Sequence, residues 1–585
     1  MTRVSLLHSL EELLGKWIGE HAPSIDGGPW ARSCQDERFG HFQTNLAMVA
    51  AKTLGQNPRA LAAQIVDFCA RDPRLETPEI AGPGFVNFRF RREALEARTL
   101  ELWRHPRAGI PGTLHPRNIV VDFSGPNVAK EMHVGHIRST ILGDAIARIL
   151  AARGECVIRD NHLGDWGTQF GKMILGYKRA GKPELSPDTA VAEMQRFYQE
   201  THEACEKDPA LMEQARHELA QLQDGDLENV TIWMTFRQLS QSAFDLIYQR
   251  LDIHFDQTLA ESFYNPWLRE VVKELLEKGV ARESEGAVAV FHDPAQPREK
   301  SPFLVKNKED WSDVPMLIQK SDGAALYATT DLATVRYRMQ EWKADTLLYV
   351  TDGRQQQHFS QLFDVCRRWG FRADFHHVWF GAVLGADGKP LKTRDGTPVR
   401  LRDLLDEAEQ RAAAILREKR PGSDSEALAQ AARVIGLGAL KYADLAQNRN
   451  LDYVFDWDKL LAFDGNTAPY LLNAYVRTRS ILRRAGETAA SPVFVFTDPV
   501  ECDLARRLLA LGDTLDAVVQ DYRPHLLCGY LYETASLFHR FFENCPVLKA
   551  ESEELKQSRL ALCELTGRVL REGLGLLGIS TLEEM

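Results

Sequence analysis

The segment IVVDFSGPNVAKEMHVGHIRSTILGDAIARILAARG spans residues 119–154, and its hydrophobic pattern changes partway along. Residues 119–123 form a short apolar run, which is typical of a buried strand. The turn-forming residues Ser-Gly-Pro-Asn at 124–127 end that run. Residues 142–150 then carry apolar side chains at helical spacing, and Gly154 marks the end of the predicted helix. A strand, a loop and a helix in this order indicate one unit of an α/β fold.

The same alternation continues downstream. A second strand with its loop is expected at 156–165, and residues 346–350 form an apolar strand that leads into a helix over about 355–369. Strands that alternate with helices favour a parallel, doubly wound sheet of the Rossmann type. Residues 180–260 carry a mostly polar helical pattern, so we predict a helical insertion there.

The two ends of the chain predict different domains. Leucines recur at helical spacing over residues 6–14, and the stretch GPGFVNFRF at 82–90 predicts a turn followed by a strand. Prolines and glycines over 106–116 indicate a linker. From about 411 the pattern is helical almost throughout. We therefore predict an α+β domain over 1–110, a Rossmann-type domain over 111–410 and an all-helical domain over 411–585.

Composition narrows the class of protein. The chain has 585 residues, no run of eighteen apolar residues, and nine cysteines without a C-x-x-C pair. A cytoplasmic protein without a membrane-spanning helix is expected, with reduced thiols and no metal centre. The net charge is 71 minus 82, or -11. That value argues against a nonspecific nucleic-acid binder but not against a selective RNA enzyme, which needs positive charge only where phosphates lie.

The motif His133-Val134-Gly135-His136 stands where the loop meets the predicted helix. A helix N-terminus favours anions because its free N–H groups and its dipole point toward them. Gly135 lets the backbone approach a flat base, and two imidazoles can donate hydrogen bonds to phosphate oxygens as charge develops there. The motif alone predicts a nucleotide-phosphate site.

Four segments carry a resemblance to a known family: FSGPNVAKEMHVGHIRST at 123–140, NHLGDWGTQFG at 161–171, YATTD at 327–331 and GNTAPY at 465–470. Together they resemble the signature of the arginyl-tRNA synthetases, in which Pro-Asn-x-Ala-Lys precedes the histidine motif. The matches follow the family order over nearly the whole chain. The resemblance implies ATP-dependent attachment of L-arginine to its tRNA through arginyl-adenylate, with Mg²⁺, and we expect a monomer.

The resemblance also implies roles for individual residues. An arginine side chain presents a charged, planar fork of donors, so its site wants carboxylates in bidentate reach. The implied arginine-binding positions are Asp122, Asn127, Tyr327, Asp331 and Gln355. Tyr470 and Arg477, on one predicted helix together with Tyr475, Arg479, Arg483 and Arg484, are implied to contact the anticodon loop.

The mobile catalytic loop of the class corresponds to residues 385–396, where this chain departs from the usual K-M-S-K-S pattern. Flanking glycines fit a hinged loop, and the loop still offers cations to a triphosphate. Lys130, just ahead of the histidine motif, is implied to share that task. The expected catalytic residues are His133, His136, Lys130, Lys389, Lys392 and Arg394, and the expected ATP-binding residues are His133, Gly135, His136 and Lys392.

Two alternatives remain open on the residues alone. A small-molecule nucleotidyltransferase can carry an H-x-G-H motif on a similar fold, although it needs neither the N-terminal domain nor the long helical C-terminus. A tRNA-binding paralogue without activity is the other, and the departure in the mobile loop is what suggests it.

Overall fold

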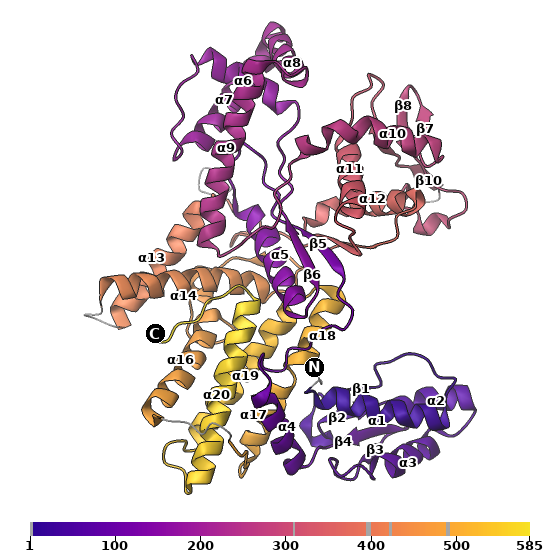
Figure 1. The fold of residues 1–585 in the computed structure, drawn as a ribbon, viewed down its shortest axis with the longest axis vertical. Helices are drawn as coiled ribbons and strands as arrows, with labels where there is room; N and C mark the ends of the chain where they lie inside the picture. The colour runs from indigo at the N-terminus through magenta and orange to yellow at the C-terminus, as the bar shows by residue number, and fades with distance from the viewer. Residues whose placement is uncertain (1–3, 308–309, 393–398, 420–423, 487–491) are drawn as a thin grey trace. The chain divides into compact units, whose positions relative to one another are not determined.

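The computed structural model describes residues 4–307, 310–392, 399–419, 424–486 and 492–585 (Figure 1). The chain divides into two compact units. The central unit comprises residues 113–423 and 447–458, and the terminal unit comprises residues 1–112, 424–446 and 459–585. Among the described residues, no helix is long and apolar enough to cross a membrane.

A four-stranded parallel sheet forms the middle of the central unit. Its order is β13-β12-β5-β6, with bounds Asp374–His377, Thr346–Tyr349, Asn118–Asp122 and Cys156–Asp160. Val120, Val121 and Leu347 are fully buried, as expected for strands with helices on both faces. The predicted parallel, Rossmann-type core is confirmed.

Helices α5 (Val134–Ala152), α11 (Tyr327–Gln340) and α12 (Gln356–Trp369) accompany these strands. Apolar side chains of α11 and α12 join the sheet, α10 (Leu268–Glu277) and the 3₁₀ segment η2 (Glu261–Trp267) in one core that includes Leu332, Leu347 and Leu362. The N-terminus of α5 therefore lies at the carboxyl end of β5, where ligands bind in open α/β sheets.

The predicted insertion is helical. It contains α7 (Ala190–Lys207), α8 (Pro209–Gln223) and α9 (Leu227–Arg250), which pack with α6 (Gln169–Arg179). Phe170, Met194 and Phe236 lie in the small core that these helices share. The mostly polar pattern of the segment follows from this shallow core, because most side chains stay near water.

Short antiparallel strands between α10 and α11 were absent from the sequence prediction. They are β7 (Arg282–Ser284), β8 (Ala287–Val290) and β11 (Met316–Gln319) in the order β11-β8-β7, and the hairpin of β9 (Leu304–Asn307) with β10 (Asp310–Asp313). Strands of three or four residues give too little alternation to detect, and β9 and β10 bury few side chains. The central unit also contains α13 (Leu401–Lys419) and the short parallel pair of β14 (Val383–Leu384) with β15 (Tyr453–Val454). Helix α15 (Trp457–Leu460) begins in the last two residues of this unit.

The N-terminal part of the terminal unit is α+β, as predicted. Its antiparallel sheet has the order β1-β2-β4-β3, with bounds Ala31–Ser33, Phe42–Thr44, Phe85–Phe88 and Glu79–Ala81. Helices α1 (Leu6–His21), α2 (Leu46–Leu54), α3 (Pro58–Cys69) and α4 (Arg92–Arg104) complete it, with the 3₁₀ turn η1 (Glu37–Phe39). Val86, Phe88 and Phe90 are all buried.

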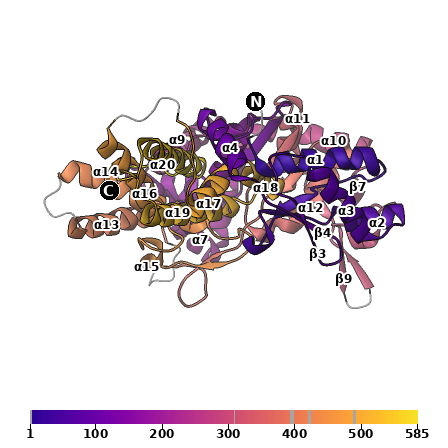
Figure 2. The same ribbon diagram turned by 90° about the horizontal axis from the view of Figure 1, so that it is seen from below.

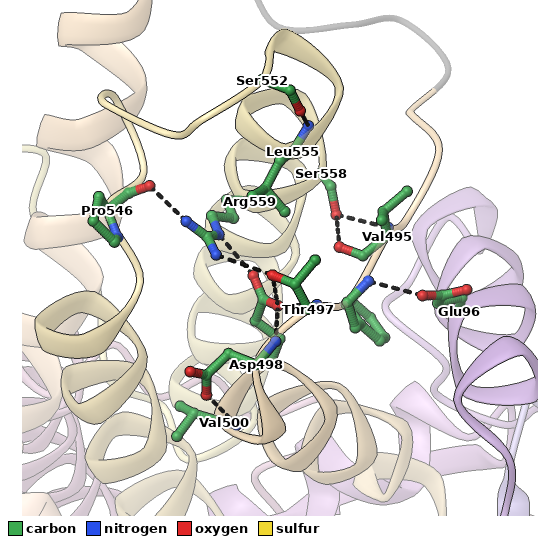
Figure 3. Close-up of polar contacts among 12 residues, drawn as sticks. Glu96, Val495, Thr497, Asp498, Val500, Pro546, Ser552, Leu555, Ser558 and Arg559 are labelled. Carbon is green, nitrogen blue, oxygen red and sulfur yellow. Dashed lines mark hydrogen bonds and ion pairs between the residues drawn. The ribbon is translucent and has the colours of Figure 1, made fainter.

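The C-terminal part is a helical bundle, also as predicted (Figure 2). It consists of α14 (Ser425–Leu445), α16 (Ala468–Ala485), α17 (Pro499–Leu509), α18 (Leu511–Asp521), α19 (His525–Asn544) and α20 (Glu553–Leu576). The apolar run at 493–496 is an extended segment before α17 and forms no strand (Figure 3). There the Phe496 N–H donates to Glu96 of α4 at 2.8 Å, and Arg559 Nε lies 2.7 Å from Glu501 Oε1.

Candidate active site

Two adjoining cavities lie at the carboxyl ends of β5 and β12. Cavity 1, of about 390 Å³, and cavity 2, of about 530 Å³, share His133, Gly135, Asp352, Arg354 and Phe380 in their walls. Cavity 1 is also lined by the predicted residues Asp122, Asn127, His136, Tyr327, Asp331 and Gln355. Cavity 2 is also lined by Lys392, Pro390, Leu391, Trp379 and Asp452.

The two histidines of the motif cap the N-terminus of α5. His133 Nδ1 accepts a hydrogen bond from the Gly135 N–H at 3.0 Å, and His136 Nδ1 accepts one from the His133 N–H at 3.1 Å. Their ring centroids are 4.2 Å apart. Because Nδ1 is an acceptor in both rings, the proton of each neutral imidazole resides on Nε2. Each ring therefore has an N–H donor left for a ligand in the cavities.

Burial keeps both imidazoles neutral. It is the largest effect lowering the pKa of His133, and it lowers the pKa of His136 to about 4, with the neighbouring His133 and Lys130 adding to the decrease. The pair can then donate hydrogen bonds to a phosphate at neutral pH without a change of charge. A Cβ on Gly135 would stand 2.7 Å from His133 Cε1, so the glycine also makes room for the His133 ring itself.

Asn127 is held in the loop between β5 and α5 by a second loop. Its backbone bridges Gly164, with the Val128 N–H donating to Gly164 O at 2.9 Å. A Cβ at Gly164 would meet Asn127 Oδ1 at 2.1 Å. The carboxamide therefore packs directly on the Gly164 backbone, and the two family-like segments at 123–140 and 161–171 form one wall of cavity 1.

Tyr327 and Asp331 lie one turn apart on α11 and both line cavity 1. The Asp331 side chain is largely buried, and its Oδ2 lies 2.6 Å from Nε2 of His358, a residue of α12 that the sequence analysis did not identify. The His358 ring also packs on the Tyr327 ring, with centroids 5.1 Å apart. The Asp331 charge is the largest effect raising the pKa of Tyr327, so the phenol remains a neutral donor and acceptor.

Gln355 follows the loop after β12 and lines the same cavity. Its Oε1 is buried and has no hydrogen-bond partner among the described residues. A buried carbonyl oxygen without a partner favours a ligand that brings a donor. His162 lines the cavity as well, and both of its ring nitrogens lack a partner in the described part of the chain.

Asp122, at the end of β5, is already partly engaged by the protein. Its Oδ2 lies 2.5 Å from Nη2 of the fully buried Arg338, and the same Nη2 lies 2.6 Å from Asp160 Oδ2. An internal guanidinium therefore already engages one oxygen of Asp122, although the residue still lines cavity 1.

Glu261 is a further acid that the sequence analysis missed. Burial, the Asp331 charge and the Asp165 charge raise the pKa of Glu261 to about 8. Asp331 therefore belongs to a group of acids, in which a cationic ligand would relieve the repulsion. The only sequence signal is an acid at the start of a segment rich in aromatic residues, and that signal is weak.

Helix α9 of the insertion holds the wall segments in place. Ser240 Oγ accepts from the Ala129 N–H at 2.9 Å, where the backbone has a positive φ of 60°. The Tyr248 hydroxyl bonds Ser124 Oγ at 2.8 Å and accepts from Asn161 Nδ2 at 3.1 Å. Ser124 also has a positive φ, of 74°. The insertion thus stabilises a strained loop beside the cavity.

The predicted cations are only partly assembled. Lys392 lines cavity 2, whereas Lys389 and Lys130 are exposed and line neither cavity. Lys130 lies close enough to His133 to lower its pKa. Residues 385–390 form a tight turn, in which the Gly385 N–H donates to Lys389 O at 2.7 Å. Arg394 lies outside the described residues.

Tyr470 and Arg477 lie on α16, which belongs to the terminal unit, whereas the residues that line the two cavities belong to the central unit. Tyr470 packs on Tyr532 and His539 of α19, and Arg477 Nη1 lies 3.0 Å from His539 Nδ1. Three further residues of this helix also have partners within the chain. Tyr475 is buried, and Glu583 engages Tyr475, Arg479 and Arg483, so these side chains have intramolecular partners instead of a free surface.

Matches to family models identify the class of protein. Residues 104–457 match the model of the catalytic domain of the class I tRNA synthetases (R), and residues 471–585 match a DALR anticodon-binding domain. Residues 20–90 match the arginyl-tRNA synthetase N-terminal domain. The fold and the H-x-G-H site are therefore those of a class I aminoacyl-tRNA synthetase.

Relatives specify the family. An arginine–tRNA ligase of Synechococcus elongatus is 46% identical, over 94% of each chain, and one of Proteus mirabilis is 44% identical, over 98% of this chain and 99% of its own. The crystal structure of arginyl-tRNA synthetase from Plasmodium falciparum superposes with a TM-score of 0.83 at 28% identity over 100% of both chains. That of Thermus thermophilus gives 0.84 at 26%, over 99% of this chain and 100% of its own. The chain belongs to the arginyl-tRNA synthetase family.

Proposed function

We infer that this chain is an arginine–tRNA ligase, which joins L-arginine to its tRNA in an ATP-dependent reaction. Family membership over nearly the full length supports this function, and it disfavours both the small-molecule nucleotidyltransferase and the inactive paralogue. The structural observation that carries the proposal is a single cavity that joins the His133–His136 pair to Tyr327 and Asp331. A donor pair for phosphate and acceptors for a cation thus meet in one site.

We propose that the reaction has two steps. In the first, a carboxylate oxygen of arginine attacks the α-phosphorus of ATP, the bond from phosphorus to the bridging oxygen breaks, and pyrophosphate leaves. In the second, a ribose hydroxyl of the tRNA terminus attacks the arginyl carbonyl carbon, and AMP leaves. No side-chain nucleophile takes part, so catalysis consists of positioning and charge stabilisation. ATP enters as its Mg²⁺ complex, with the phosphates as metal ligands.

His133 and His136 act as neutral Nε2–H donors to the phosphate groups in this proposal. Gly135 is part of the same ATP-binding turn, and Lys392 is the cation that lines cavity 2. Lys130, Lys389 and Arg394 are proposed as further cations for the triphosphate. A hydrogen-bond donor such as His133 or His136, placed where charge develops, contributes a factor of about 10²–10³ to the rate.

For arginine, we propose that Asp331 and Tyr327 receive the guanidinium and that Asn127, Gln355 and Asp122 complete the pocket. The acids near Asp331 and the unpartnered Gln355 Oε1 support this assignment, because both favour a cation with several N–H donors. A neutral amino acid of the same size would leave these acceptors without partners.

For tRNA, we propose that the helix α16 surface around Tyr470 and Arg477 contacts the anticodon loop. Aromatic side chains stack unpaired bases and arginine binds phosphate. The domain division 1–110, 111–410 and 411–585 is proposed as the functional division; the three family matches follow the same order, with the catalytic-domain match extending to residue 457. We also propose a cytoplasmic monomer.

The test is aminoacylation with purified protein, ATP, Mg²⁺, tRNA and each of arginine, lysine and citrulline. Formation of arginyl-tRNA alone supports the proposal. Transfer of an adenylyl group from ATP to a small molecule without any charged tRNA would favour a nucleotidyltransferase instead. Light scattering of the same sample determines whether the chain is a monomer.

A further inference from the structure

Two acids on neighbouring strands are brought together behind the wall of cavity 1. Asp122 on β5 and Asp160 on β6 are register partners in the parallel sheet. Asp160 is fully buried, and Asp122 is nearly so but lines the cavity. Two adjacent carboxylates in a buried setting cannot both stay ionised without a cation.

Arg338 supplies that cation from the last turns of α11, the helix that also carries Tyr327 and Asp331. Its side chain is fully buried, and Nη2 alone contacts both carboxylates, at 2.5 Å and 2.6 Å. The guanidinium also lies over the Tyr349 ring, with Cζ 5.3 Å from the centroid. Arg338 does not line either cavity.

The contact leaves the two oxygens of Asp122 in different situations. Oδ2 accepts from Arg338, whereas the side chain keeps 13% of its surface exposed toward the cavity. Oδ1 is the oxygen that Arg338 does not engage. Three buried polar atoms of this cluster have no hydrogen-bond partner among the described residues: Arg338 Nε, Arg338 Nη1 and Asp160 Oδ1. Hydrogen bonding alone would therefore not favour this arrangement.

We propose that Arg338 is a positioning residue of the arginine site, whose Nη2 holds Asp122 through Oδ2 and restricts it to a contact through Oδ1 with one substrate N–H group. This inference rests on the proposed function. It means that Asp122 cannot form a bidentate pair with the substrate guanidinium. That pair falls to another acid of the cavity, and Asp122 instead fixes the substrate at a single point.

Charged and titratable groups from several packed elements surround Asp122. They are Asp160 of β6, Tyr349 of β12, Tyr264 of η2, Tyr327, Asp331 and Arg338 of α11, and His162 in the loop after β6. Burial is the largest effect raising the pKa of Asp160; Arg338 opposes the rise and Asp122 adds to it. Without Arg338, repulsion between the two buried carboxylates should favour a protonated form of the pair.

The experiment measures equilibrium binding of L-arginine and of ATP separately, between pH 6 and pH 8.5, as ratios to the wild type. Arg338→Met should weaken arginine binding about tenfold or more at pH 7, with recovery as the pH rises, because the acid pair loses its proton. ATP binding should change less than about twofold. In Arg338→Met/Asp160→Asn the repulsion is gone, so most of the arginine affinity should return and the added pH dependence should disappear.

Arg338→Lys retains a buried cation and should bind arginine with no added pH dependence, which keeps the inference testable if Arg338→Met does not fold. Three results would overturn it: wild-type arginine binding by Arg338→Met, equal losses for arginine and ATP without pH dependence, or the same pH dependence in Arg338→Lys and Arg338→Met. Asp122→Asn separates this inference from the proposed function. If that variant binds arginine normally, the arginine-site assignment of Asp122 is at fault. If it binds poorly while Arg338→Met binds normally, only the role of Arg338 fails.

Discussion

The imidazole of His358 is hydrogen-bonded to the carboxylate of Asp331, with Nε2 2.6 Å from Oδ2. His358 comes from α12 and Asp331 from α11, so the bond ties together two helices of the core. The same ring packs on Tyr327. One side chain thus orients both the carboxylate and the phenol that we propose for the arginine guanidinium.

Removal of this contact should weaken arginine recognition specifically. In His358→Ala the Asp331 carboxylate loses a charge-assisted hydrogen bond, which is typically worth about 1.5–3 kcal/mol. We expect the KM for arginine to rise about tenfold or more, with the KM for ATP nearly unchanged. Steady-state aminoacylation at varied arginine and ATP measures both. His254→Ala, at an exposed position, is the control, and a parallel rise of both KM values would indicate a general loss of structure.

The neutral state of His136 leads to a prediction about pH. Burial lowers its pKa to about 4, so the ring stays uncharged from well below neutral pH upward. His136→Ala should reduce the rate of adenylate formation by about 10²–10³. Because the wild-type ring does not titrate between pH 6 and pH 8.5, that factor should be the same at both ends of the range. Rapid-quench measurements of a single turnover give the rate, and a factor that grows toward low pH would mean that His136 acts as a cation.

The same pKa shift has a consequence for stability. The unfolded state binds a proton at His136 near pH 6.5, whereas the folded state does so only near pH 4. The stability contributed by the neutral ring is therefore complete above about pH 6.5 and falls as the pH decreases toward 4. The urea midpoint of the wild type should exceed that of His136→Gln by less at pH 5 than at pH 7.5. An equal advantage at both pH values would contradict the shift.

Asp331→Asn addresses substrate choice. The substitution preserves the shape of the side chain but removes the charged acceptor, so guanidinium recognition should weaken more than recognition of an uncharged analogue. Citrulline should become a better competitor relative to arginine, by about tenfold. Inhibition of arginine attachment by citrulline measures the ratio in the two proteins. An unchanged ratio with normal arginine affinity would assign Asp331 a structural role.

The Rossmann-type core could be predicted because its signals are local. The change from a strand pattern to a helix pattern between residues 119 and 150 describes β5, the loop and α5 without any distant contact. The antiparallel strands β7 to β11 could not be predicted in this way. Strands of three or four residues leave too little pattern, and the pairing of β8 with β11 joins residues up to about thirty positions apart.

The same difference between local and long-range contacts applies to the candidate site. The resemblance of the segments to a family gave the candidates that line cavity 1, but the residues that orient them come from elsewhere in the chain. Arg338 contacts Asp122 across 216 positions and Tyr248 contacts Ser124 across 124. No spacing rule connects such pairs, because tertiary packing alone brings them together.

Gly164 offers a test of the wall of cavity 1. A Cβ there would stand 2.1 Å from Asn127 Oδ1, so Gly164→Ala must displace the carboxamide or the loop. We expect a loss of arginine affinity of about tenfold or more, at a small cost in global stability, because overpacking typically costs about 1–3 kcal/mol. Gly181→Ala is the contrasting variant, since a Cβ there would have open space but a positive φ of 82°. Normal arginine binding by Gly164→Ala would mean that Asn127 is free to move.

Stability of the terminal unit should depend on one buried ion pair. Arg559 Nε lies 2.7 Å from Glu501 Oε1, and both side chains are buried. Glu501 also accepts from the Thr497 and Asp498 N–H groups through Oε2, at 2.6 Å and 2.8 Å, and Arg559 Nη1 donates to Pro546 O at 2.9 Å. The pair therefore fixes the extended segment against α17 and α20.

Arg559→Met should destabilise the protein by about 3–5 kcal/mol, because it leaves the Glu501 carboxylate buried without its cation. The double variant Glu501→Gln/Arg559→Met removes the isolated charge, while Gln can still accept from Thr497 and Asp498, so it should recover part of the loss. The urea midpoint of the far-ultraviolet circular dichroism signal measures the order of the three proteins. The double variant must lie between the other two, since a double variant less stable than Arg559→Met would show that the charge on Glu501 stabilises the segment even without Arg559.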